Sequence, residues 1–92
     1  MMLDRIREYL TLHGYTLHAQ EVTTWRRLPS GKVIEYRLYY TGRNNKLVII
    51  YMTEIYGEKK LENIIYYIEM SPVFDEILYR KLCEIVKNGD DM

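Results

Sequence analysis

The residues with the most specific chemical signature lie in one stretch, WRRLPSGK, which covers residues 25–32. It places an aromatic ring, two arginines and a lysine around a Pro-Ser-Gly turn. Arginine and lysine neutralise nucleic-acid phosphates, and aromatic rings stack on unpaired bases. The stretch is therefore either a basic hairpin that contacts nucleic acid or the solvated tip of a hairpin. The candidates for phosphate contacts are Arg26, Arg27, Lys32, Arg37, Arg43 and Lys46.

The charges are unevenly distributed along a chain whose net charge is zero. Residues 21–50 carry six basic and two acidic residues, and residues 51–92 carry five basic and nine acidic residues. A net charge of zero argues against strong non-specific binding of nucleic acid. The uneven distribution still allows a local basic patch in the middle segment.

Catalytic chemistry has only weak support in the sequence. Glu58-Lys59-Lys60 contains the Glu-x-Lys pair of one class of metal-dependent nuclease, but that reaction needs a further carboxylate, and Glu54 is the only nearby one. The two histidines, His13 and His18, have no partner at ligand spacing, and Cys83 falls on an apolar helix stripe. We therefore predict no catalytic site, no metal site and no cofactor.

Length and composition indicate a single domain covering residues 1–92, with the last few residues frayed. The longest apolar run, LVII at residues 47–50, is far shorter than a membrane span, so no membrane association is expected. The single cysteine suits a reducing compartment and predicts a cytoplasmic location. The bias toward tyrosine and isoleucine would suit an archaeon of hot environments or its virus, and a viral protein would act in the host cytoplasm.

Six elements must position these residues. Apolar residues at helical spacing predict a helix over 3–13, with Gly14 as its C-terminal cap. Runs of β-branched and aromatic residues predict strands over 16–27, 33–40, 47–53 and 63–70. Two turns, over 28–31 and 42–45, join the first three strands. A second helix is predicted from Ser71-Pro72, with Ser71 as N-cap, to about residue 87.

This order predicts an α+β fold: an antiparallel β-meander of about four strands flanked by an N-terminal and a C-terminal helix. One alternative stays open, because the apolar residues over 61–70 also fit a helical stripe.

The predicted turns suggest a register for the sheet. If Arg27 and Lys32 flank the first turn, Trp25 faces Ile34. If Thr41 and Lys46 flank the second turn, Tyr40 faces Leu47. This register places one set of apolar side chains, which includes Trp25, Ile34, Tyr40 and Leu47, on one face. It leaves Val48, Ile50 and Met52 on the opposite face.

Those three side chains are too apolar to be left in water together. Either the helices cover opposite faces of the sheet, or both cover one face and the other meets a partner. We favour partial coverage with self-association as a homodimer through the sheet or its edge. The predicted interface residues are Tyr39, Val48, Ile50, Met52 and Tyr67.

The sequence thus indicates a small non-catalytic interaction protein, an adaptor, regulator or inhibitor. It would bind an unknown protein partner through an apolar, tyrosine-rich sheet surface. The alternative is a protein that binds DNA or RNA through the basic hairpin over 25–46.

Overall fold

The computed structural model describes the backbone of residues 2–26 and 31–88, and the side chains of Trp25 and Arg26 lie outside this description. The first predicted turn falls on residues 28–31, of which only Gly31 is described. The chain forms α1 (Met2–Leu12), β1 (Thr16–Arg26), β2 (Lys32–Thr41), the short 3₁₀ turn η1 (Arg43–Asn45), β3 (Leu47–Tyr56), β4 (Leu61–Ser71) and α2 (Glu76–Asn88). Within this part of the chain, neither helix is long and apolar enough to cross a membrane.

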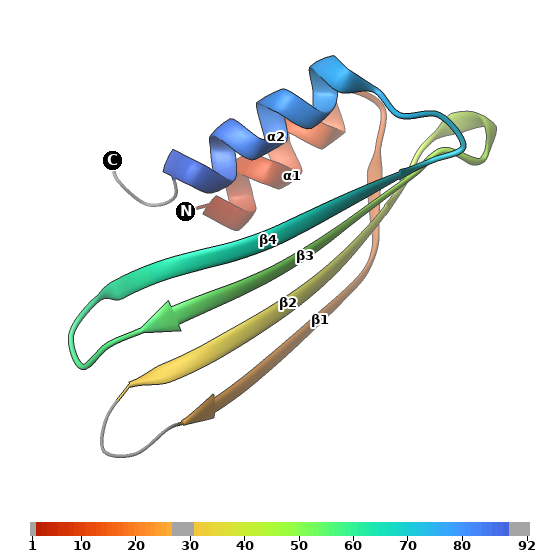
Figure 1. The fold of residues 1–92 in the computed structure, drawn as a ribbon. Helices are drawn as coiled ribbons and strands as arrows, with labels where there is room; N and C mark the ends of the chain where they lie inside the picture. Colours follow the sequence, from red (N-terminus) through yellow and green to blue (C-terminus); the bar gives the residue numbers. More distant parts are fainter. Residues whose placement is uncertain (1, 27–30, 89–92) are drawn as a thin grey trace.

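The strands form one open antiparallel sheet in the order β1-β2-β3-β4, which makes this an α+β fold with a helix at each end. Both helices lie on the same face of the sheet (Figure 1). α1 contacts β1, α2 contacts β4, and the two helices contact each other. The expected meander is therefore confirmed, and within the described residues one face of the sheet carries no helix.

The core lies between the two helices and the three strands β2, β3 and β4. Ile6 and Leu10 from α1 and Leu82 and Val86 from α2 have no exposed surface. They pack against alternate residues of the strands, namely Leu38, Tyr40, Val48, Ile50, Met52 and Ile68. Burial of large aliphatic side chains is the main favourable term in folding, at about 1.5–3 kcal/mol for each side chain.

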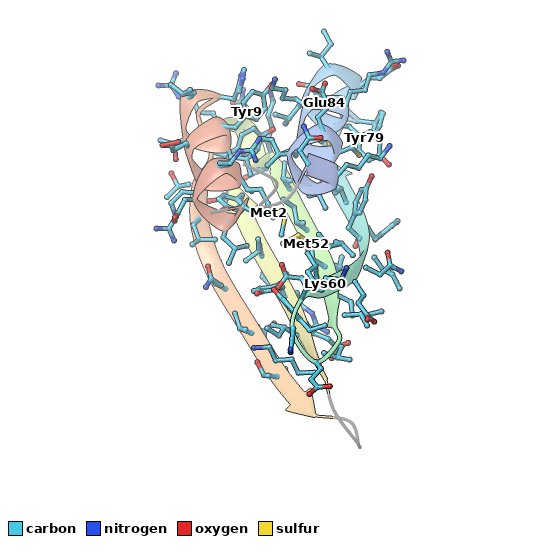
Figure 2. All side chains as sticks on the ribbon, turned by 90° about the vertical axis from the view of Figure 1, so that its left-hand side faces the viewer. Met2, Tyr9, Met52, Lys60, Tyr79 and Glu84 are labelled. Carbon is cyan, nitrogen blue, oxygen red and sulfur yellow. The ribbon has the colours of Figure 1, made fainter. Side chains whose placement is uncertain are left out.

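The helices cover only part of the length of the sheet. A helix of 11 residues, such as α1, spans about 16 Å, whereas a strand of 11 residues, such as β1, spans about 36 Å. The sheet therefore extends beyond the helices toward the β1–β2 and β3–β4 connections (Figures 1 and 2). Lys60, in the β3–β4 connection, lies well away from both helices (Figure 2).

The segment over residues 61–70 is a strand, and its helical alternative is wrong. β4 pairs with β3 from Leu61 to Ser71, with one extra residue at Glu62. The predicted start of the last helix is also wrong. Ser71 is the last residue of β4, opposite Leu47, so it is unable to cap a helix. Asp75 takes this role, because its side-chain Oδ1 accepts a hydrogen bond from the Leu78 N–H at 3.1 Å.

The predicted register is wrong by one residue at both connections. Gly42 N–H donates to the Lys46 carbonyl at 2.9 Å, so three residues, and not four, lie between the last pair of residues that bond across the β2–β3 connection. Asn44 and Asn45 make this short connection with positive φ angles of 58° and 60°. Tyr40 therefore pairs with Val48, and Trp25 pairs with Val33.

A slip of one residue moves every side chain of a strand to the other face. Val48, Ile50 and Met52 thus lie under the helices, with exposed fractions of 1%, 0% and 2%. Their neighbours Leu47, Ile49 and Tyr51 lie on the helix-free face instead. The structure corrects the expectation that Val48, Ile50 and Met52 form an exposed interface.

Candidate functional site

The helix-free face carries a group of exposed or half-buried apolar and aromatic side chains. Tyr39 and Ile49 form one cross-strand pair, and Tyr51 and Tyr67 form the next. Ile65 lies one step further along β4, opposite Thr53. We call the surface formed by Tyr39, Ile49, Tyr51, Ile65 and Tyr67 the tyrosine face.

The most exposed members of the tyrosine face lie on the edge strand. Ile65 is 57% exposed and Tyr67 is 62% exposed. The ring of Tyr67 lies 6.0 Å from the ring of Tyr51, measured between centroids. Toward the middle of the sheet, Tyr39, Ile49 and Tyr51 are half-buried by their neighbours. The apolar character of this face thus increases toward β4.

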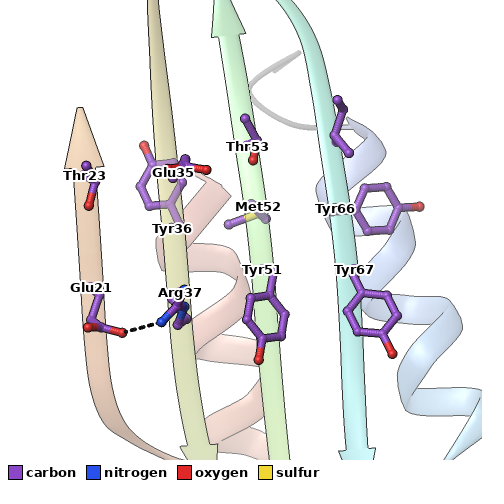
Figure 3. A pocket seen from close by; sticks show the side chains of 11 residues that line it. Glu21, Thr23, Glu35, Tyr36, Arg37, Tyr51, Met52, Thr53, Tyr66 and Tyr67 are labelled. Carbon is purple, nitrogen blue, oxygen red and sulfur yellow. Dashed lines mark ion pairs between the residues drawn. The ribbon is translucent and has the colours of Figure 1, made fainter. Parts of the chain in front are cut away.

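The tyrosine face borders a row of charged residues on β1 and β2. Arg37 forms an ion pair with Glu21 at 3.5 Å, and its guanidinium carbon lies 5.7 Å from the centroid of the Tyr51 ring (Figure 3). A hydrogen bond to Tyr39 is the main cause that raises the pKa of Arg37. Arg37 is thus engaged on three sides within the protein.

A shallow hollow of about 280 Å³ lies between these two groups. Its walls include Glu21, Arg37, Thr53, Tyr51 and Tyr67 (Figure 3). Partial burial, followed by a hydrogen bond to Glu69, raises the pKa of Tyr51. The Tyr51 phenol is therefore a neutral hydrogen-bonding group at physiological pH, suited to contacts with another polar and apolar surface.

The predicted basic residues do not come together. Arg26 and Lys32 form a cross-strand pair at one end of the sheet. Arg43 and Lys46 lie in the connection at the opposite end, roughly 30 Å away along a strand of ten residues. Arg37 lies between them and is paired with Glu21. Arg27 lies outside the described residues. The backbone positions of the other five are spread along the length of the sheet, so they are not gathered at one place.

Glu54, considered as a metal ligand, has a different environment. It lies on the helix side of β3, where the helices end, and it is 4% exposed. Its Oε1 accepts hydrogen bonds from the hydroxyls of Tyr36 at 2.7 Å and Tyr56 at 3.1 Å. Among the described residues, no three His, Cys, Asp or Glu side chains are placed to hold a metal ion.

Cys83 lies on α2 next to two tyrosines. Burial, with a hydrogen bond to Cys83 as the next cause, raises the pKa of Tyr66 to about 12. A hydrogen bond to Cys83 is the first cause that raises the pKa of Tyr79. The thiol is therefore associated with phenols that stay protonated at physiological pH.

Sequence reasoning identified Tyr39 and Tyr67 but missed Ile49, Tyr51 and Ile65. The alternation of β3 was visible in the sequence, but the predicted register placed its outward residues on the same face as Tyr40, and which face the helices cover was left open. The glycine and two asparagines at residues 42, 44 and 45 were the available signal, because they permit a three-residue connection.

No protein-family model matches this chain, and no curated protein or solved structure matches it either. A functional proposal therefore depends on the geometry of the molecule and on its sequence.

Proposed function

We propose that this chain is a non-catalytic interaction protein, an adaptor, regulator or inhibitor, that binds another protein through the tyrosine face. The observation that carries the proposal is the exposure of Ile65 and Tyr67 on a sheet face without a helix. Tyrosine is enriched in protein interfaces because it buries a large area at a low cost in conformational entropy. A cytoplasmic location belongs to the same proposal and is supported by the single cysteine.

A binding role suits the polar groups of this face better than catalysis. The polar groups of this face are engaged with one another, Glu21 with Arg37 in an ion pair and Tyr51 with Glu69 in a hydrogen bond. An engaged ion pair at the rim of a hydrophobic surface contributes to the choice of partner more than to affinity.

The charge of the helix-free face disfavours nucleic acid as its ligand. By the strand register, three carboxylates, Glu21, Glu35 and Glu69, accompany one guanidinium, Arg37. Phosphate binding depends on several closely placed cations, which the described residues of this face do not provide. A protein surface that presents apolar groups and a few hydrogen-bond donors is the better match.

A test of the proposal compares three immobilised proteins: the wild type, Tyr39→Asp and Val22→Asp. Val22 is the matched control, because it is an apolar residue, 48% exposed, on the opposite side of the sheet. We expect proteins from a nuclease-treated extract of the source cells to bind the wild type and Val22→Asp, but not Tyr39→Asp. The bound set should persist between about 50 and 500 mM salt, because apolar contacts are weakly screened.

Retention of the same proteins by Tyr39→Asp would refute the proposal. Fluorescence anisotropy with labelled DNA and RNA tests the alternative function. Binding that falls at least about tenfold between 50 and 200 mM salt, and that the double variant Arg26→Glu/Arg27→Glu abolishes, would support a nucleic-acid-binding hairpin instead.

A further inference from the structure

The two free edges of the sheet differ in character. The outer edge of β1 carries polar side chains and an irregularity between Leu17 and Ala19. The edge of β4 carries Ile65 and Tyr67, both more than half exposed. Bulges and polar residues protect an edge strand from pairing, whereas a regular apolar edge favours it. Apart from the extra residue at Glu62, β4 is regular to its end.

We propose that two copies of this chain pair through β4, in antiparallel orientation, around a two-fold axis at Tyr66. Ile65 then lies opposite the partner's Tyr67, and Ile64 lies opposite the partner's Ile68. Cross-strand pairs of an aromatic and a β-branched residue are among the favourable pairs in sheets. The symmetry makes each of these contacts twice.

Polar groups single out this register among its neighbours. Asn63 lies opposite the partner's Glu69. The Oδ1 atom of Asn63 already accepts the Ile64 N–H at 2.9 Å, which leaves its amide N–H groups to donate to that carboxylate. An axis at Tyr67 would instead place Ile65 opposite the partner's Glu69, and an axis at Ile65 would place Leu61 there. Of these three axes, only the one at Tyr66 places apolar side chains opposite apolar ones and polar side chains opposite polar ones.

Two hollows beside β4 give independent support for a strand at this edge. One, of about 300 Å³, lies between Ile64 and Tyr66 of β4 and Val86 and Lys87 of α2. The other, of about 430 Å³, extends along Tyr67–Met70 to Phe74 and Tyr79. A strand laid along β4 runs past both hollows, so its side chains on the helix side are able to fill them.

The area of the whole helix-free face, which contains the tyrosine face, indicates what the pairing would achieve. Four strands of about ten residues make a face of roughly 600 Å². A standard protein interface takes about 800 Å² from each partner, so one copy falls short. Edge pairing joins two faces into one sheet of eight strands with about twice that area. This use of the joined face rests on the proposed function, whereas the pairing itself does not.

The experiment uses disulfide cross-linking in a Cys83→Ser background. Ile65→Cys and Tyr67→Cys are made as separate chains, and each is oxidised alone and then in an equal mixture. Residues directly opposite in a sheet lie within disulfide distance, whereas two Ile65 positions lie on a diagonal beyond about 7 Å. We expect linked dimers to be several times more abundant in the mixture than in either chain alone. Sedimentation of the wild type should give twice the mass of the 11.2 kDa chain.

A mass of one chain at micromolar concentration would overturn the proposal, and so would equal cross-linking in all three samples. The control is the same mixture on the opposite edge, Glu21→Cys with Thr23→Cys on β1; preferential cross-linking there would assign the contact to β1 and refute pairing through β4. Tyr39→Asp, on the interior strand β2, should leave the β4 cross-link unchanged. Failure of the pairing and failure of the proposed function are therefore observed separately.

Discussion

Glu54 shows how one residue closes an incompletely covered core. It follows the buried Met52 on the helix side of β3, at the point where the helices end. A carboxylate at 4% exposure is costly to bury unless its oxygens accept hydrogen bonds. Tyr36 on β2 and Tyr56 on β3 supply these bonds, so three polar side chains close the end of the apolar core.

Replacement of Glu54 tests this role at the residue scale. Glu54→Ala removes the acceptor from both hydrogen bonds, and we expect the free energy of unfolding to fall by about 1–3 kcal/mol. Glu54→Gln is the matched control, because its amide oxygen still accepts from the tyrosines. Urea denaturation followed by circular dichroism measures both variants. Equal stability of Glu54→Ala and the wild type would show that the network does not stabilise the fold.

At the scale of elements, the β4–α2 connection separates two signals that are adjacent in the sequence. Ser71-Pro72 resembles a helix start, but the backbone of Ser71 pairs with Leu47. The N-cap lies four residues later, at Asp75, whose side chain accepts the Leu78 N–H and whose carbonyl accepts the Tyr79 N–H, and the helix begins at Glu76. Ser71 could either pair with β3 or cap a helix, and in the structure it pairs with β3.

The choice of cap is testable with a pair of alanine variants. Asp75→Ala should lower the free energy of unfolding by about 1 kcal/mol, because it leaves an orphan N–H in the first turn of α2. Ser71→Ala should have a much smaller effect, since its exposed side chain caps no helix. Thermal denaturation of both variants gives the comparison. A larger loss for Ser71→Ala would restore the sequence-based assignment of the cap.

At the scale of the whole molecule, the sheet is longer than the helices that cover it. The molecule measures 47 × 24 × 18 Å, and both helices pack over one part of its length (Figure 1). The described core cluster ends near Met52 on β3 and Ile64 on β4, so the ends of the strands beyond these residues lie outside it. We therefore expect two parts of different local stability.

Hydrogen exchange should show this difference. Backbone amides at Thr23–Thr24 and Ile55–Tyr56 should exchange faster than amides at Leu38–Tyr40 and Val48–Ile50, which lie under the helices. Local opening of an uncovered segment disrupts fewer buried contacts and therefore costs less free energy. Exchange measured by mass spectrometry or NMR gives the protection of each segment. Uniform protection along the strands would contradict the division.

Most of the local structure of this protein follows from its sequence alone. Helical spacing of apolar residues, Gly14 after the first helix and β-branched runs predicted six elements in the right order, with ends within three residues of those observed except at the start of α2. Glycine and asparagine at residues 42–45 correctly marked a turn with positive φ angles. These signals depend on neighbours in the chain, because backbone propensity and short-range hydrogen bonds create them.

Only the tertiary structure decided which side of each strand faces the core. Alternation in β3 defines two sets of residues, but the choice between Val48 and Ile49 as the buried one depends on a single residue in the β2–β3 connection. That connection contains three residues, which turns Tyr51 outward and Met52 inward. Both sets are apolar, so composition is unable to separate them. The helices, distant in sequence, select the buried set by packing on one face, and the tyrosine face is the surface they leave open.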